Sequence, residues 1–245
     1  MKQFQWIYQD GGHRWGVISR DPAKPGHVID TNEYLVASGN CGMLLDPGGS
    51  EIFPAVLSAL SKEFDPAKIS YVFASHQDPD IASSLALWVE MSHDLKCLVS
   101  WLWESFLPHY GVAAGTFVTI PDEGMEFTLD RLILRLVPAH YLHSSGNFNV
   151  YDAKAKILFS GDIGAALLPP DHNQLFVTNF DQHIRHAEMF HLRWMGSNEA
   201  KQRWCERVSK LDIDMMCPQH GAIYRGADVR RFIDWFGALK VGCAP

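Results

Sequence analysis

The strongest constraint on the fold is an apolar strand that runs directly into a cluster of polar residues. Residues 69–74 are rich in β-branched and aromatic side chains and have the length of a strand. The polar residues 75–80 follow at once, and residues 81–90 have the apolar spacing and composition of a helix. A strand, a short loop and a helix in this order predict an α/β fold, with the loop at the carboxyl end of the strand.

This loop carries one imidazole and two carboxylates at alternate positions. In an extended backbone His76, Asp78 and Asp80 point to the same side and form a set of metal ligands. Imidazole mixed with carboxylate suits iron, manganese or zinc. A second interpretation is structural, because Asp-Pro-Asp before a helix is also a turn in which Asp80 caps the first helical amides.

Length and composition indicate an ordinary globular protein. The 245 residues predict a single domain over 1–245, and the 47% of hydrophobic residues allow a sizeable core. The formal net charge of -7 argues against nucleic acid as a partner. We expect a cytoplasmic protein without a membrane partner, because no apolar segment resembles a signal or a bilayer span. The five cysteines include no Cys-x-x-Cys pair, which predicts reduced thiols.

The rest of the chain divides into a half that favours a parallel sheet and a half that favours an antiparallel one. In the first half the patterns predict strands at 33–38, 42–46 and 96–100 and helices at 51–63 and 101–107. Short strands are expected in the second half at 116–120, 131–137, 148–151 and 156–159. The C-terminal part predicts one long helix or two over 182–192 and 198–210, a strand at 212–217 and a helix at 226–239.

Three further polar residues follow predicted strands in the same way as the 75–80 loop. They are His143, Asp162 and His220, each close to glycine and each after an apolar strand. Loops at strand ends on a rigid sheet are where open α/β folds place their chemistry. His183, His186 and His191 are different: they lie on a predicted helix without a His-Glu-x-x-His motif, and we expect them on a solvated helix face.

In their order and approximate spacing, these motifs and Asp46-Pro47-Gly48 resemble the metallo-β-lactamase fold superfamily over residues 33–225. The resemblance implies an α/β fold arranged as an αβ/βα four-layer sandwich. Zinc hydrolases of this superfamily carry His-x-His-x-Asp-His, whereas flavodiiron proteins carry His-x-Glu-x-Asp. The sequence His76-x-Asp78-x-Asp80 is more similar to the second motif, and the carboxylate at its centre favours iron or manganese over zinc.

The resemblance to the di-iron branch implies a ligand for each metal position. His76, Asp78 and His143 would bind one iron, Asp80 and His220 the other, and Asp162 would bridge the two. His140 is the alternative ligand to His143 or else a pocket residue. Asp46 is expected to orient a ligand histidine, and Tyr141 to line the pocket. Asp78 replaces the usual glutamate and is one methylene shorter, which leaves its reach to the metal open.

The same resemblance implies two iron ions and no FMN within this chain, because no flavodoxin-like segment is present. The expected function is binding of dioxygen or nitric oxide by a stand-alone sensor module, of the kind associated with chemotaxis receptors. Two alternatives stay open: an oxygen or nitric oxide reductase supplied by a separate electron donor, and a zinc-dependent hydrolase. A receptor-like partner, an electron-donor protein and a homodimer are open as well.

Overall fold

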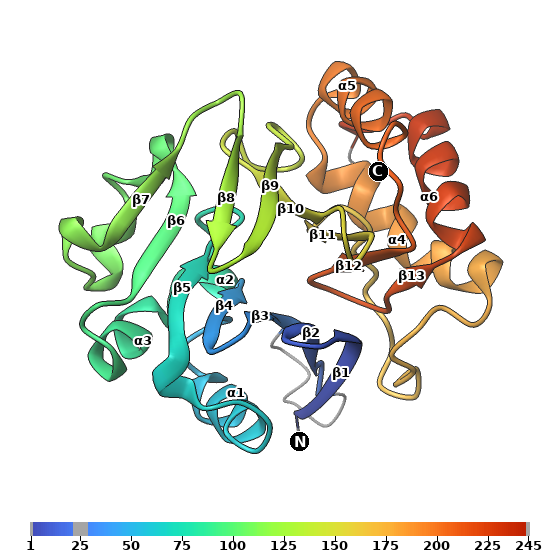
Figure 1. The fold of residues 1–245 in the computed structure, drawn as a ribbon. Helices are drawn as coiled ribbons and strands as arrows, with labels where there is room; N and C mark the ends of the chain where they lie inside the picture. The colour runs from blue at the N-terminus through green and yellow to red at the C-terminus, as the bar shows by residue number, and fades with distance from the viewer. Residues whose placement is uncertain (1, 22–28, 244–245) are drawn as a thin grey trace.

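Two β-sheets pack face to face, and helices cover the outer face of each (Figure 1). The computed structural model describes residues 2–21 and 29–243. The first sheet has the strand order β1-β2-β3-β4-β5-β6-β7, and the second has the order β13-β12-β11-β10-β9-β8. The four-layer αβ/βα sandwich predicted from the sequence is therefore confirmed.

The first sheet joins an antiparallel part to a parallel part. Its strands are β1 (Gln3–Asp10), β2 (His13–Ser19), β3 (Glu33–Ser38), β4 (Cys41–Leu45), β5 (Ile69–Phe73), β6 (Lys96–Ser100) and β7 (Phe117–Ile120). Strands β1 to β4 pair antiparallel, and β4 to β7 pair parallel. The parallel strands end at one edge, so the loops that follow them gather there.

The second sheet is antiparallel except for one pair. Its strands are β8 (Met125–Leu129), β9 (Leu132–Pro138), β10 (Phe148–Asp152), β11 (Ile157–Gly161), β12 (Met215–Pro218) and β13 (Tyr224–Arg225). The parallel pair is β11 with β12. The loops after these two strands therefore leave the same edge of the sheet, next to the loops of the first sheet.

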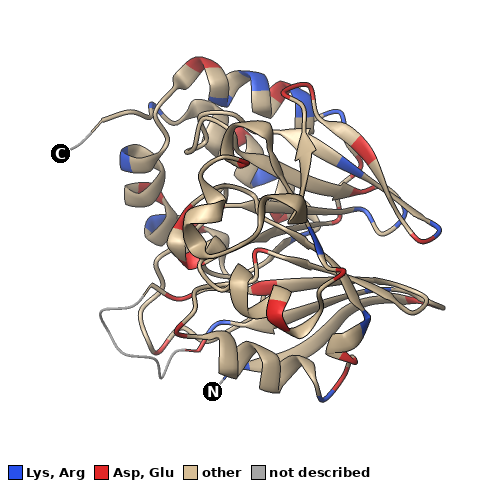
Figure 2. Cartoon of the chain, turned by 90° about the vertical axis from the view of Figure 1, so that its left-hand side faces the viewer, with Lys and Arg blue, Asp and Glu red and all other residues tan. Residues whose placement is uncertain are grey.

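Six α-helices in the described part of the chain complete the outer layers. They are α1 (Phe53–Leu60), α2 (Pro79–Ala82), α3 (Leu85–Met91), α4 (Phe180–Trp194), α5 (Asn198–Val208) and α6 (Ala227–Ala238). Helices α1 to α3 cover the first sheet and α4 to α6 the second, and only the second group carries both acidic and basic residues (Figure 2). None of the helices in the described part of the chain is long and apolar enough to cross a membrane.

Aromatic rings from both sheets fill the space between them. Phe159 of β11 lies 5.4 Å from the ring of Tyr34 and 6.2 Å from the ring of Phe73, measured between centroids. All three side chains are completely buried. Each such burial stabilises the fold by about 1.5–3 kcal/mol. This central layer holds the two sheets, and hence their strand-end loops, in a fixed relation.

The helix predicted over 81–90 is broken into α2 and α3. Ser84 precedes α3, and its hydroxyl donates to the carbonyl oxygen of Gly48 at 2.7 Å. The hydroxyl of Ser83 accepts a hydrogen bond from the backbone nitrogen of Ser50 at 3.0 Å. Serine side chains that bond to backbone in this way compete with helix formation. The break attaches the loop after β4 to the loop after β5.

Three other local expectations are wrong, because contacts with distant parts of the chain outweigh the local sequence pattern. The strand expected at 116–120 in the antiparallel half is β7, which pairs parallel with β6 in the first sheet. The helix expected at 101–107 is the short 3-10 turn Trp101–Trp103, followed by another at Leu107–Tyr110. The expected solvated histidine face of α4 is also wrong, since His183 and His191 are buried.

Candidate metal centre

Four loops at the shared strand-end edge bring the six predicted ligands together. The loop after β5 supplies His76, Asp78 and Asp80, the β9–β10 loop supplies His143, and His220 and Asp162 follow β12 and β11. Each loop leaves a strand whose side chains pack between the sheets. Residues far apart in the sequence are therefore held at one point by the rigid core.

Asp162 lies at the centre of this cluster. Its Oδ2 atom is 2.9 Å from Nε2 of His143 and 3.5 Å from Nε2 of His76. Its Oδ1 atom is 3.3 Å from Nε2 of His220, which in turn lies 3.5 Å from Oδ2 of Asp80. The two oxygens of one carboxylate thus face two separate groups of side chains. This is the arrangement required of a carboxylate that bridges two cations.

The shorter side chain of Asp78 reaches the cluster. Its Oδ2 atom lies 3.3 Å from Nε2 of His143 and 3.5 Å from Nε2 of His76. One donor atom from each of these three residues lies within 4.8 Å of the other two. The alternative reading of the loop as a helix cap by Asp80 is wrong, because the residue at the N-cap of α2 is Asp78, whose side chain makes no capping hydrogen bond.

A buried hydrogen-bond chain fixes the ring of His76. The hydroxyl of Ser75 donates to Oδ2 of Asp46 at 2.6 Å, and Nδ1 of His76 lies 2.9 Å from the same hydroxyl. Because the Ser75 proton points to the carboxyl group, the hydroxyl oxygen accepts from Nδ1 of His76. The Nε2 lone pair of His76 is then free for a metal. Asp46 directly follows β4 and has a φ of 46°, a left-handed conformation that aspartate tolerates.

His220 is oriented by the backbone of a distant segment. Its Nδ1 atom lies 2.7 Å from the carbonyl oxygen of Asp30, which accepts but cannot donate, so Nδ1 carries the proton. Asn32 holds this segment in place. Its side-chain amide donates to the carbonyl oxygen of Gly221 at 2.9 Å, and its backbone nitrogen donates to the carbonyl oxygen of Gln219 at 2.7 Å. Nε2 of His220 therefore faces the carboxylates and is the ring atom that a metal ion would bind.

Gln77 and Tyr110 belong to the site, although neither is among the residues predicted from the sequence. The amide nitrogen of Gln77 donates to Oδ1 of Asp78 at 3.1 Å, and its amide oxygen accepts from the hydroxyl of Ser144 at 2.7 Å. The hydroxyl of Tyr110 donates to the carbonyl oxygen of Gln77 at 3.0 Å. One amide thus ties the loop of Asp78 to the loop of His143. The place of Gln77 between the alternating loop residues was the available signal.

The electrostatics of the cluster favour positive charge at its centre. Burial alone would lower the pKa of His143 and of His220, but Asp162 and the neighbouring carboxylates outweigh it and raise each to about 9. Burial would likewise raise the pKa of Asp162, yet the surrounding imidazoles hold it well below its ordinary value. Burial raises the pKa of Asp46 to about 7, against the opposing effect of His76. A buried set of carboxylates that stabilises cations to this degree is suited to metal ions.

His140 and Tyr141 lie on the far side of the His143 loop. Nε2 of His140 is 2.7 Å from the carbonyl oxygen of Asp122, and its ring packs against Phe148. Tyr141 is 58% exposed. Both line a surface cavity together with residues of α5, rather than the space between the clustered ligands. The prediction placed both residues at the pocket around the ligands, whereas the structure places them at this outer cavity.

The residues present fit a pair of hard metal ions. Nε2 of His76, Nε2 of His143 and Oδ1 of Asp162 are buried, and within the described ranges their close contacts with the neighbouring side chains lack hydrogen-bond geometry. Unpartnered buried polar atoms are costly unless a ligand completes them. Three carboxylates with three imidazoles match the donor preferences of iron or manganese and contain no thiolate.

Comparison with known proteins identifies the family. A family model described as ODP family beta lactamase matches residues 29–221. The chain belongs to this family. It is similar to the solved structure "Peroxy diiron species of chemotaxis sensor ODP", with 38% identity and a TM-score of 0.88 over 98% of this chain and 96% of that one. The apo state of chemotaxis sensor ODP from T. denticola matches with 38% identity and a TM-score of 0.89 over the same shares.

More distant similarities extend to flavodiiron proteins. A flavo di-iron protein from Thermotoga maritima is 22% identical, with a TM-score of 0.83 over 97% of this chain and 61% of that one. The rubredoxin-oxygen oxidoreductase of Megalodesulfovibrio gigas is 23% identical over 92% of this chain and 60% of its own length. An uncharacterized protein of Methanocaldococcus jannaschii is 24% identical over 79% and 49%, respectively. This ODP-family chain thus spans about half to three fifths of these curated relatives.

Proposed function

We propose that this ODP-family protein is a di-iron dioxygen sensor. The observation that carries the proposal is the convergence of three imidazoles and three carboxylates around Asp162, whose two oxygens face different groups of ligands. Its similarity over nearly the whole chain to a chemotaxis sensor, in a structure described as a peroxy diiron species, supports the same chemistry. Two ferrous ions, when bound, supply the electrons that dioxygen accepts.

In this proposal the chain's own residues hold and orient the metals. His76, Asp78 and His143 would hold one iron, His220 and Asp80 would hold the other, and Asp162 would offer one carboxylate oxygen to each. Asp46 acts through Ser75 to aim the ring of His76, and the carbonyl oxygen of Asp30 aims the ring of His220. Gln77 keeps the carboxylate of Asp78 in place. Such outer partners fix tautomer and ring orientation before a metal arrives.

Metal analysis combined with an optical spectrum tests the proposal. Protein purified without air is expected to contain two irons per chain and to develop a visible charge-transfer band on exposure to oxygen. A band that persists without turnover is expected for a sensor, whereas sustained oxygen consumption with an external electron donor would identify a reductase. Zinc at full occupancy with esterase activity and no band would contradict both and indicate a hydrolase.

Two histidines of one loop give a matched pair of variants for the same experiment. His143→Ala is expected to lose iron and the oxygen-dependent band, because its Nε2 faces Asp78 and Asp162. His140→Ala is expected to keep both, since Nε2 of His140 bonds to a backbone oxygen away from the cluster. The opposite pattern would exchange the roles of the two residues. The same proposal includes a partner protein that resembles a chemotaxis receptor. Co-purification with and without oxygen would detect it.

A further inference from the structure

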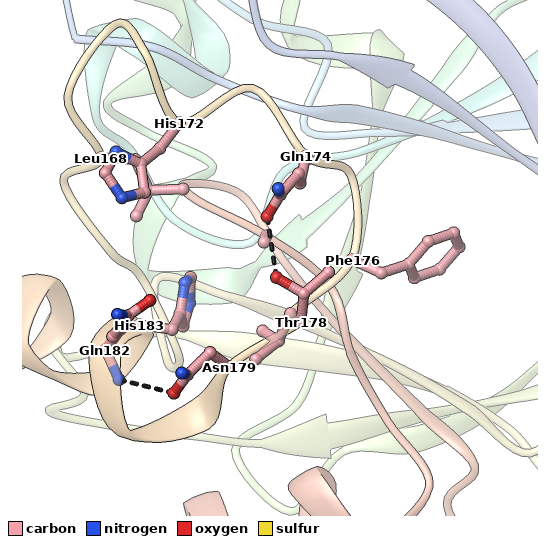
Figure 3. A pocket seen from close by; sticks show the side chains of 10 residues that line it. Leu168, His172, Gln174, Phe176, Thr178, Asn179, Gln182 and His183 are labelled. Carbon is pink, nitrogen blue, oxygen red and sulfur yellow. Dashed lines mark hydrogen bonds between the residues drawn. The ribbon is translucent and has the colours of Figure 1, made fainter.

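A polar cavity lies at the N-terminus of α4, and none of the six clustered side chains lines it. Its polar lining consists of His172, Gln174, Thr178, Asn179, Gln182 and His183 (Figure 3). It encloses about 40 Å³. A cavity of that size holds roughly three water-sized groups. The space suits a small ligand or one functional group of a larger one.

His183 is a buried polar group in need of a partner. It is 7% exposed, and among the described residues its Nε2 atom has no hydrogen-bond partner. Figure 3 shows its imidazole rising from α4 into the space between Gln182 and the segment that carries His172. An unsatisfied buried polar atom of this kind destabilises the folded protein. A polar guest in the cavity would remove this cost.

The surroundings of His183 favour a negatively charged guest. Besides burial, three basic groups lower the pKa of His183 to about 4: His186 on the same helix, Arg20 after β2, and His172 across the cavity. Within the described ranges, the lining includes no carboxylate. The neighbouring Asp171 is exposed and pairs with His172 at 3.2 Å. Basic groups converge here in a chain whose overall charge is -7.

Hydrogen bonds at the start of α4 leave donors for the cavity. The amide oxygen of Gln174 accepts from the hydroxyl of Thr178 at 2.8 Å, and the amide oxygen of Asn179 accepts from the backbone nitrogen of Gln182 at 3.1 Å (Figure 3). Both amide acceptors are used, so their NH₂ groups supply the donors. The N-terminus of α4, a helix of 15 residues, adds partial positive charge, and the acidic residue of its first turn, Asp181, pairs with Arg231 at 2.8 Å.

We propose that this cavity binds a small oxyanion, a carboxylate or a phosphate group, between His183 and the N-terminus of α4. The oxyanion accepts hydrogen bonds from the imidazole of His183 and from the amide NH₂ groups of Gln174 and Asn179. The proposal is independent of the metal centre, because no predicted ligand contributes to the cavity. Its failure and the failure of the di-iron proposal are therefore separate results.

Calorimetric titration of the full metal-loaded chain tests the site. Sodium acetate and sodium phosphate are the probes, each at constant ionic strength, and sodium chloride is the reference. Binding of acetate alone identifies a carboxylate site, and binding of phosphate alone identifies a phosphate site. The NMR signals of the His183 imidazole are expected to shift with the same saturation curve. Heat and signal changes no larger than those caused by chloride would overturn the proposal.

Gln182 offers a matched pair of variants because its side chain is exposed and lines the cavity, while its backbone nitrogen makes the hydrogen bond to Asn179. Gln182→Glu places a carboxylate beside the bound anion and is expected to weaken binding at least about tenfold. Gln182→Met has nearly the same size without the charge and is expected to stay within about threefold of the unmodified protein. His183→Phe is expected to weaken binding at unchanged iron content. Equal affinities for the glutamate and methionine variants would refute an anion site.

Discussion

Replacing Ser75 by alanine is expected to weaken the fold and metal binding together. The hydroxyl of Ser75 lies between Asp46 and His76, and all three side chains are completely buried. The substitution removes the bond to the carboxyl group, worth about 1.5–3 kcal/mol, and the bond to the imidazole, worth about 0.5–1.5 kcal/mol. The second bond to Asp46, from the backbone nitrogen of Ser75 at 2.7 Å, survives. The free energy of unfolding of the metal-free protein should fall by about 2–4 kcal/mol.

The effect on metal affinity follows from the loss of ring orientation. Without the Ser75 hydroxyl, Nδ1 of His76 has no acceptor to fix its proton, so Nε2 is presented to a metal less often. Loss of an outer partner of a ligand histidine typically lowers metal affinity about 10–100-fold. Urea denaturation of the metal-free variant measures the stability, and competition with a chelator measures the iron affinity.

Ser84→Ala is the matched control. Ser84 is equally buried, and its hydroxyl donates at 2.7 Å to the carbonyl oxygen of Gly48, outside the ligand cluster. It should lose about 1 kcal/mol of stability and keep its iron affinity. If Ser75→Ala and Ser84→Ala bound iron equally well, the orientation of His76 through Ser75 and Asp46 would be refuted.

Three further variants probe other parts of the structure. Burial lowers the pKa of His191 to about 4. Its contribution to the free energy of unfolding is therefore complete above the unfolded pKa of about 6.5 and is lost as the pH falls from there to about 4. In His191→Gln the midpoint of urea denaturation should vary less with pH over that range. Phe159→Ala should cost about 3–5 kcal/mol in urea denaturation, since the ring fills the space between the sheets. Gln77→Ala should lower iron affinity about tenfold in chelator competition, because the amide holds Asp78 and the His143 loop together.

The sequence predicted the architecture because its signals were local. The strands β3 to β6 and β9 to β12 have strong apolar patterns, and the polar residues after them mark the strand-end edge. Strand β7 was assigned to the wrong half, because the choice of partner strand depends on the whole sheet. The helix after the 75–80 loop is broken by the hydroxyls of Ser83 and Ser84, whose backbone partners lie more than thirty residues away in the sequence.

The sequence predicts the candidate ligand side chains but not the hydrogen-bond partners that orient them. The six candidate ligands stand out as polar residues after apolar strands. The partners that orient them leave no such pattern: the acceptor for His220 is a backbone oxygen of Asp30, which any residue type provides. His183 was read as solvated, because helical spacing alone cannot distinguish a histidine under a loop from one in water. Its burial depends on the segment between β11 and α4.

The attachment of His220 to the 30–32 segment has a bearing on how the protein is made. The clustered side chains span His76 to His220, and the segment that aims the last of them precedes the first. During synthesis, the early strands emerge long before β12 can join the second sheet. A nascent chain therefore offers only part of the cluster, and a bound metal pair marks a chain whose two halves have already met.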